Sequence, residues 1–136
     1  MNKLLLITIW IVSALVADAA TYYVDNDAGN DASAGTSTGT AWQRCPGDAT
    51  ATGTAASTTL VAGDTVIFKG GVNYKRTITL SKSGTLGSRI VFDGNSAGSW
   101  GTGKAVLNFT NHPTDQIGFS TSAGISNVTI KNFEFT

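Results

Sequence analysis

The sequence predicts an all-β protein, and within that class a β-solenoid, from its composition and from the spacing of its apolar segments. Gly, Ser, Thr and Asn are abundant and only 13% of the residues are charged, which favours strands and turns over helices. The apolar triplets 66–68 and 90–92 lie 24 residues apart, and Val106 and Val128 lie 22 residues apart. Hairpin strands usually recur after about 8–12 residues, so this wider spacing is typical of solenoid coils. A fragment of an ordinary β-sandwich is the alternative that the pattern leaves open.

The N-terminus has the pattern of a secretory signal peptide. Lys3 supplies a basic start, residues 4–16 are almost entirely apolar, and Ala17 and Ala19 place small side chains where a signal peptidase cleaves. We predict cleavage between Ala19 and Ala20. A membrane anchor is the alternative, but a spanning helix needs about 20 apolar residues and this run is shorter. We therefore expect a secreted, extracellular protein (or a periplasmic or cell-surface one) that has no membrane contact after cleavage.

The segment after the signal peptide is expected to form a cap region. Alternating side chains predict a strand over residues 21–24, and residues 25–40 form a long polar loop that Trp42 attaches to the body of the domain. The small polar residues of 44–57 allow at most one turn of helix. Cys45 is the single cysteine, so it cannot form an internal disulfide, and we expect it to be buried.

The rest of the chain is expected to form the first coils of the solenoid, with Gly- and Ser-rich turns between short strands. The last residues still alternate apolar and polar side chains at Thr136, and natural proteins avoid an uncapped apolar strand edge. We therefore expect the chain to be the first part of a longer protein. Its predicted organisation is a signal peptide (1–19), a strand, polar loops and cap region (20–59) and the first coils (60–136). The strands predicted in these coils span residues 65–68, 74–80, 89–93, 105–109, 117–119 and 128–135.

Several segments together carry a resemblance to a known class of proteins. They are the entry strand at 22–25, the loop that ends at Trp42, the Gly-bounded strands at 62–71 and 89–94, and the alternating segment at 125–135. In this order they resemble the N-terminal part of secreted right-handed parallel β-helix proteins. This pectate-lyase-like class includes family 9 polysaccharide lyases and related β-helix repeat proteins. The resemblance implies an all-β, right-handed parallel β-helix, of which this chain supplies the N-terminal cap and the first two or three coils.

The sequence departs from this class at the cap. Many β-helices begin with an amphipathic helix that covers the end of the core, whereas residues 48–59 have no apolar stripe. We expect the strand at 22–24, Trp42 and the polar loop to cover the core instead.

The resemblance implies an exported, carbohydrate-associated protein with polysaccharide as its partner, and in its enzymatic form a uronate lyase whose catalytic coils lie beyond Thr136. Such a lyase needs a cation beside the sugar carboxylate and a Lys or Arg that acts as the base. No residue matches the catalytic set of the family, so we assign none and expect this segment alone to be inactive. The alternative is a non-catalytic surface or adhesion solenoid or a carbohydrate-binding module, because a fold does not determine a function. The sequence predicts no oligomeric state. The available cations are Lys69, Lys75, Arg76, Lys82 and Arg89.

The charge balance and the spacing of the carboxylates limit which other partners the sequence predicts. The chain has nine basic and nine acidic residues, and removing Lys3 and Asp18 with the signal peptide keeps this balance, so no net charge attracts nucleic acid. Asp25, Asp27 and Asp31 place three carboxylates close together, and hard oxygen ligands at such spacing can hold Ca²⁺. The alternative is an Asp/Asn turn that bonds its own backbone. No other cofactor is evident, and Ca²⁺ is an expectation for the longer protein.

Three further motifs are interpreted as structural. Residues 98–104 have the spacing of a phosphate-binding loop, but Ala105 stands where Mg²⁺ binding needs a hydroxyl and a strand follows, so a Gly-rich turn is predicted. His112 is the only histidine and is predicted to be a loop residue. Asn127 and Asn132 are predicted to lie at coil turns, with side-chain amides bonded to an adjacent coil.

Overall fold

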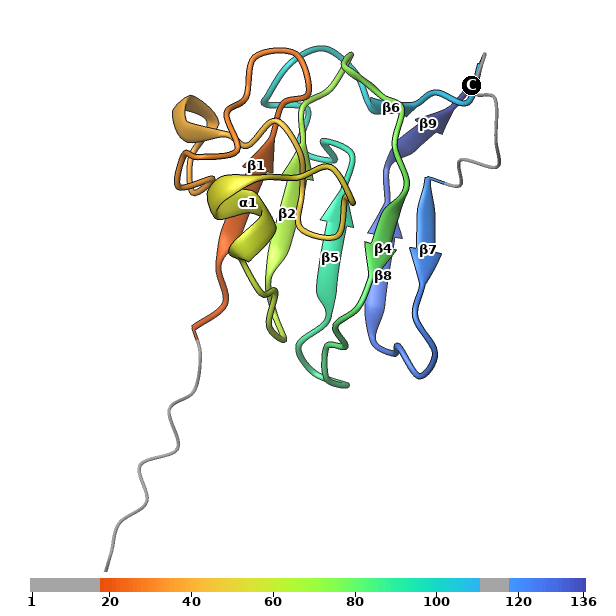
Figure 1. The fold of residues 1–136 in the computed structure, drawn as a ribbon. Coiled ribbons are helices and arrows are strands. Elements are labelled where there is room, and N and C mark those ends of the chain that lie inside the picture. The colour runs from red at the N-terminus through yellow and green to blue at the C-terminus, as the bar shows by residue number, and fades with distance from the viewer. Residues whose placement is uncertain (1–17, 111–117) are drawn as a thin grey trace, which may run out of the picture.

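The computed structural model describes residues 18–110 and 118–136, which form a mostly β structure with two short helices (Figure 1). The helices are the 3₁₀ helix η1 (Thr38–Thr40) and α1 (Gly53–Ser57). The prediction of an all-β protein is therefore confirmed for this part of the chain. The strands are β1 (Thr21–Val24), β2 (Thr65–Phe68), β3 (Asn73–Tyr74), β4 (Ile78–Leu80), β5 (Ile90–Asp93), β6 (Ala105–Leu107), β7 (Phe119–Thr121), β8 (Val128–Lys131) and β9 (Phe133–Phe135).

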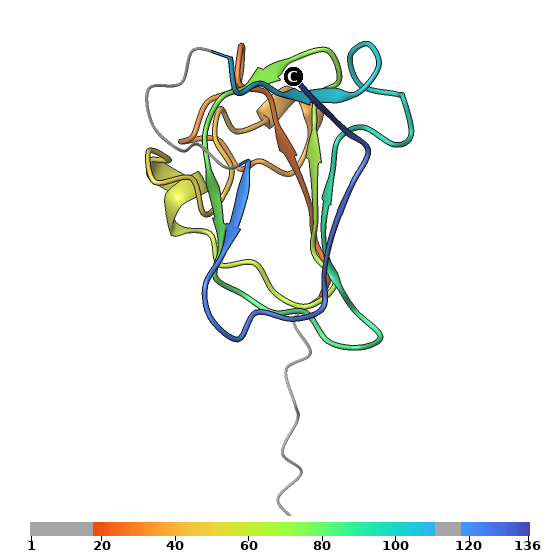
Figure 2. The same cartoon turned by 90° about the vertical axis from the view of Figure 1, so that its right-hand side faces the viewer.

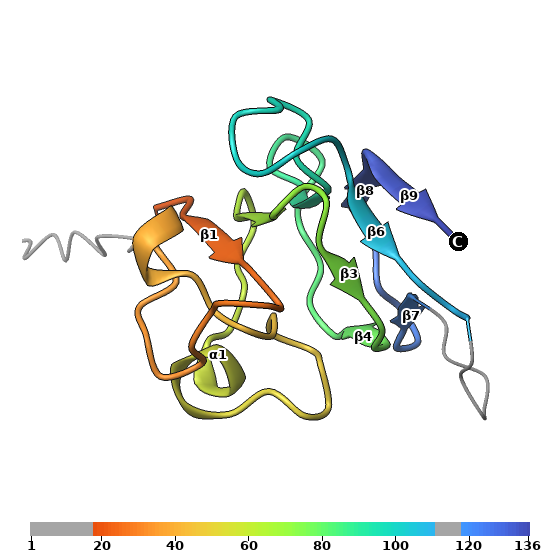
Figure 3. The same ribbon diagram turned by 90° about the horizontal axis from the view of Figure 1, so that it is seen from above.

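The strands form three sheets in which every strand pair is parallel. The four-stranded sheet has the order β1-β2-β5-β8, the three-stranded sheet β3-β6-β9 and the two-stranded sheet β4-β7. From β2 onward the chain visits the four-, three- and two-stranded sheets in that order and then repeats the order. We call one round through the sheets a passage. Because parallel neighbours cannot be joined by tight hairpins, each strand pairs with a strand of the same sheet from a neighbouring passage. Figure 3 shows β1 at one end of this arrangement and β8 and β9 at the other, and Figure 2 views it from the latter end.

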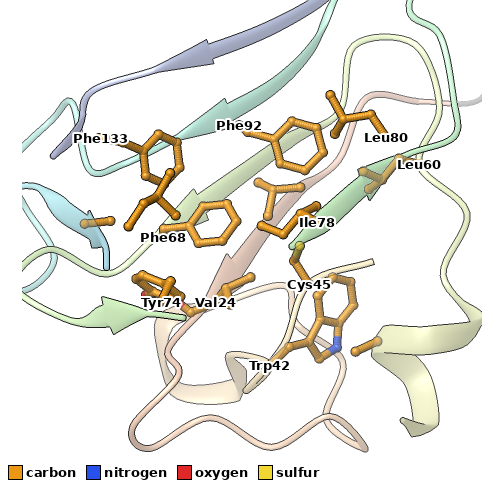
Figure 4. Close-up of a cluster of buried hydrophobic side chains, with 14 of the residues drawn as sticks. Val24, Trp42, Cys45, Leu60, Phe68, Tyr74, Ile78, Leu80, Phe92 and Phe133 are labelled. Carbon is orange, nitrogen blue, oxygen red and sulfur yellow. The ribbon is translucent and has the colours of Figure 1, made fainter. Parts of the chain in front are cut away.

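The core lies between the three sheets and is filled by side chains that alternate along each strand (Figure 4). Val66 and Phe68 of β2 are buried, whereas Thr65 and Ile67, which alternate with them, are half-buried. The ring of Phe68 lies 5.2 Å from that of Phe133, centroid to centroid. Aromatic side chains from different passages therefore contact one another edge to face and make the core continuous.

The register of the four-stranded sheet differs from the predicted recurrence. Val66 pairs with Phe92 and not with Ile90, so the alignment of the two apolar triplets was wrong by two residues. A shift of two residues keeps each side chain on the same face, which is why the triplets still looked equivalent. Val106 and Val128 belong to different sheets, so their spacing was no repeat at all.

Two predicted strands are each divided between two sheets. The segment 74–80 contains β3 and β4, and the segment 128–135 contains β8 and β9. The second division falls at Asn132, whose φ of 59° lies in the left-handed region that ends an extended strand. The apolar–polar alternation is interrupted at both corners, at Arg76 and at Asn132, so the sequence carried a sign of each turn that the prediction of single strands did not use.

The segment before β2 covers one end of the core. β1 forms the outer strand of the four-stranded sheet, and Trp42 is fully buried and stacks on Tyr22 at 4.8 Å between ring centroids. The indole Nε1 of Trp42 donates to the backbone oxygen of Ser33 at 2.8 Å, so the predicted attachment of the polar loop by this residue is confirmed. The predicted burial of Cys45 is also confirmed. Burial raises the pKa of its thiol, which keeps it protonated.

Candidate functional site

A polar pocket of about 580 Å³ lies where the N-terminal loops meet the segment that leads from β3 to β4. Three basic side chains line it together with a single carboxylate, that of Asp27, so the local charge is positive. The remaining lining side chains are amides, which can both donate and accept hydrogen bonds. We call this hollow the basic pocket. It is lined by Asn26, Asp27, Gln43, Arg44, Asn73, Lys75 and Arg76.

The amide side chains of the basic pocket are held by hydrogen bonds that cross between distant segments. Gln43 Nε2 donates to the backbone oxygen of Asn26 at 3.3 Å, and Asn26 Nδ2 donates to the backbone oxygen of Asn73 at 3.2 Å. Asn108, on the following passage of the chain, donates to Asn73 Oδ1 at 3.2 Å. These bonds join the N-terminal loops to β3 and fix the relative positions of the pocket walls.

Arg44 is oriented in the pocket by the buried carboxylate of Asp31. The backbone N–H of Arg44 donates to Asp31 Oδ1 at 2.7 Å, and its guanidinium Nη1 donates to Asp31 Oδ2 at 3.0 Å. Thr52 adds two further donors to the same carboxylate, from its backbone N–H and its hydroxyl. Burial raises the pKa of Asp31, but these backbone bonds and the guanidinium outweigh burial and lower the pKa overall. Asp31 therefore stays ionised and accepts from Nη1 of the guanidinium, and the other guanidinium nitrogens of Arg44 do not bond this carboxylate.

Lys75 and Arg76 come from the short segment between β3 and β4 and are both exposed. The preceding Tyr74 is buried, and its hydroxyl donates to the backbone oxygen of Val24 at 2.8 Å, which anchors the segment against β1. Within residues 18–110 and 118–136, the ion pairs are Arg44–Asp31, Lys69–Asp25 and Lys131–Asp93, and Lys75 and Arg76 belong to none of them. Their charges are available to an anion that enters the pocket.

The three carboxylates predicted as Ca²⁺ ligands are not brought together. Asp25 accepts from Lys69 Nζ at 2.7 Å, while Asp31 is bound to Arg44 and Asp27 lines the basic pocket. Asp25 Oδ1 also accepts from the backbone N–H groups of Asp27 and Ala28, which is the local turn given as the alternative. In the described part of the chain, no group of three metal-binding side chains occurs.

The predictions for the remaining motifs differ in how they compare with the structure. Asn132 donates to Asp93 Oδ1 at 3.4 Å on the preceding strand of the sheet, which confirms the predicted bond to an adjacent coil. Asn127 instead bonds Ser126 in its own turn, so the same prediction was wrong there. Residues 98–104 form a turn that leads into β6, as predicted. His112 lies outside the described residues.

Sequence reasoning missed Arg44 and the amides as site residues. Lys75 and Arg76 were noted only as available cations. No local signal marks Arg44, because it lies in a small polar segment and meets Lys75 and Arg76 only through pairing of β1 with β2 and through the amide bonds.

The buried aspartates predict an acid-sensitive fold. Burial raises the pKa of Asp25, Asp31 and Asp93, but their hydrogen bonds and cations outweigh it and lower each pKa. A lowered pKa in the folded state stabilises the protein above the unfolded value of about 3.9, and this contribution is lost as the pH falls through the folded value. We expect the free energy of unfolding, measured with urea between about pH 7 and about pH 3, to fall steeply below about pH 4.

Asn substitution at Asp31 should reduce this acid-dependent loss, because the amide has no charge to lose. Asp27→Asn is the matched control, since Asp27 is exposed and outside the ion pairs. If the free energy of unfolding depended on pH in the same way in the wild type and in Asp31→Asn, the lowered pKa of Asp31 would not be a source of the acid sensitivity.

No known protein family and no curated protein sequence matches this chain. Among the described residues, the helices are too short and too polar for any of them to cross a membrane.

Proposed function

We propose that this chain belongs to an exported, right-handed parallel β-helix protein and that its basic pocket binds an acidic polysaccharide. The order in which the chain visits three parallel sheets supports the β-helix, since each of the two complete passages, β2-β3-β4 and β5-β6-β7, adds one strand to each sheet. The signal-peptide pattern supports export, because it has a basic start, an apolar run and small residues at the cleavage position. The resemblance noted above supports carbohydrate as the partner.

The observation that carries the binding proposal is the set of cations in the basic pocket. Arg44, Lys75 and Arg76 face a hollow that contains one carboxylate, Asp27. Guanidinium and ammonium groups form strong hydrogen bonds with carboxylates, and a planar guanidinium can bind both oxygens at once. The neighbouring amides of Asn26 and Gln43 can bond sugar hydroxyls, which both donate and accept. A uronate residue presents a carboxylate and hydroxyls on one ring, so it matches both parts of the lining.

The pocket supports binding better than catalysis. A uronate lyase would need a base next to a cation that neutralises the sugar carboxylate, and the pKa of the base must be lowered for it to lose its proton. Lys75 and Arg76 are both exposed to solvent, so neither lies in an enclosed site that excludes water. We therefore assign substrate binding to this segment and any lyase chemistry to further coils of a longer protein.

The proposal predicts selective binding of a polyuronate. The full chain should be retained in an affinity gel that contains soluble polygalacturonate, and not in one that contains the uncharged polymer dextran. Substituting both Lys75 and Arg76 by Gln should weaken retention by about tenfold, since each exposed charge pair contributes up to about 1 kcal/mol. Added salt should weaken wild-type binding because it screens exposed charges.

A matched control shows whether binding depends on the basic pocket or only on the total positive charge of the protein. Lys82→Gln combined with Arg89→Gln removes the same charge from two exposed residues that do not line the basic pocket. This double variant should bind polygalacturonate like the wild type. Equal losses in both double variants would sink the pocket as the binding site, and equal retention in both gels would sink the acidic polysaccharide as the ligand.

A further inference from the structure

The outer face of the four-stranded sheet carries a row of side chains that plays no part in the basic pocket. Tyr23 of β1 pairs with Ile67 of β2, Ile67 with Asp93 of β5, and Asp93 with Lys131 of β8. Ile67 alternates with the buried Val66 and Phe68, and residues paired across a parallel sheet share a face, so the row belongs to the face opposite the core. The row ends in an aromatic ring on one side and an ion pair on the other.

Trp100 adds a second ring beside Tyr23. The ring centroids lie 5.4 Å apart and the planes meet at 82°, so the two rings form an aromatic corner. Both side chains are half-buried, and both line a hollow of about 120 Å³ over the outer face of the sheet. This hollow is smaller than the roughly 300–1,000 Å³ of pockets that bury drug-sized ligands, and its size suits a single small ring. We call it the aromatic hollow.

The turn that carries Trp100 is held firmly in place. Asn95 is 5% exposed, has a left-handed φ of 73°, and uses its side-chain amide to bond the backbone of both Gly103 and Trp100. The backbone oxygen of Trp100 accepts from Gly70 at 3.0 Å, at the end of β2. A Cβ on Gly70 would lie only 2.1 Å from the oxygen of Gly103, so the two turns touch backbone to backbone. The indole is therefore presented by a rigid turn and not by a loose loop.

The polar groups of the aromatic hollow complement the two rings. Asp93 accepts from the hydroxyl of Ser96 and from Lys131 Nζ, which fixes its carboxylate at the edge of the hollow. The hydroxyls of Thr38 and Ser99 are exposed at its rim. Among the lining residues, the only charged side chain is that of Asp93; Lys69 Nζ lies 6.0 Å from the centroid of the Trp100 ring but is paired with Asp25 and does not line the hollow.

We infer that the aromatic hollow is a second carbohydrate site, which takes one uncharged pyranose ring of a polysaccharide. The C–H face of a pyranose is apolar and packs on an indole, while the hydroxyls around its edge bond carboxylate, amide and hydroxyl groups. The lining presents a carboxylate but no cation to a sugar, because Lys131 and Lys69 lie outside the lining and are paired with Asp93 and Asp25, so the site selects against the uronates proposed for the basic pocket. The two sites have different linings, so this inference stands or falls independently of the basic pocket.

A matched pair of small sugars tests the inference on the full chain. Methyl β-D-glucopyranoside and methyl β-D-glucuronide share one ring and differ in the C6 carboxylate. In an NMR titration followed at the indole N–H signals, the neutral glycoside should shift the Trp100 signal with a Kd on the order of 1 mM. The glucuronide should bind there at least several-fold more weakly. The Trp100 signal is assigned by its absence in Trp100→Phe.

Variants of both sites decide between the possible outcomes. Followed at the backbone amide signals of Ser96 and Ser99, which line the hollow in both proteins, Trp100→Ala should weaken binding of the neutral glycoside at least tenfold, and a retained wild-type indole position for Trp42 shows that this variant still folds. Lys75→Gln with Arg76→Gln should leave it unchanged. The inference is overturned if the Trp100 signal does not move at tens of millimolar glycoside, if the glucuronide binds the aromatic hollow as well as the neutral sugar, or if Trp100→Ala binds like the wild type.

Discussion

Substituting Trp42 by Ala is expected to lower the free energy of unfolding by about 3–5 kcal/mol, one of the two largest effects that the structure predicts. The indole is 0% exposed, stacks on Tyr22, and donates its Nε1–H to the backbone oxygen of Ser33. Gly35 packs so closely that a Cβ there would lie 2.2 Å from the indole ring. Because the surrounding backbone is closely fitted to the ring, the cavity left by Ala cannot collapse easily.

Urea denaturation of the full chain measures this effect. Trp100→Ala is the matched control, because it removes the same side chain from a half-exposed position and should cost much less. A midpoint for Trp42→Ala equal to that of the wild type would show that this indole does not hold the N-terminal segment on the core.

Substituting Phe68 by Ala is expected to cost about 3–5 kcal/mol, because this ring joins three passages of the chain. Phe68 is 1% exposed, and its ring centroid lies 5.1 Å from that of Tyr74, 6.5 Å from Phe92 and 5.2 Å from Phe133. These partners belong to β3, β5 and β9. Removing the ring takes away aromatic contacts within one passage and between successive passages (Figure 4).

Phe135→Ala is the control for this prediction. Phe135 lies on β9 with Phe133 but is 65% exposed, so its truncation should change stability by less than about 1 kcal/mol. Both variants can be compared by thermal and urea unfolding. Similar losses for Phe68→Ala and Phe135→Ala would contradict a core that runs through the three sheets.

The sequence predicted individual strands better than their pairing. Residues 21–24 and 65–68 were predicted with the bounds that the structure has, because alternation and flanking turn residues act locally. The pairing of Val66 with Phe92 was missed, since a register shift of two residues keeps the same face buried. The turn at Asn132 was missed as a strand boundary, because the sequence shows an Asn but not the sheet to which the next residue belongs.

The residues of the two sites were harder to predict from the sequence than the strands were. Of the three carboxylates grouped in the sequence, Asp25 and Asp31 are paired with different cations in the structure, and Asp27 lines the basic pocket. Conversely, Arg44 and Arg76 are distant in the sequence and line one pocket. The turn around Trp100 was correctly interpreted as Gly-rich, but its closeness to Tyr23 depends on the pairing of strands between them.

By itself, the sequence determined the β class, the burial of Cys45, the anchoring role of Trp42 and the positions of most turns. Each of these follows from composition or from neighbouring residues, whose geometry is limited by local backbone preferences. Only the tertiary structure decided the register of the three sheets, the lining of the basic pocket and the right-angled pair of Tyr23 and Trp100. These features join residues that lie far apart in the chain, and their relative positions depend on every intervening turn and on the packing of the whole core.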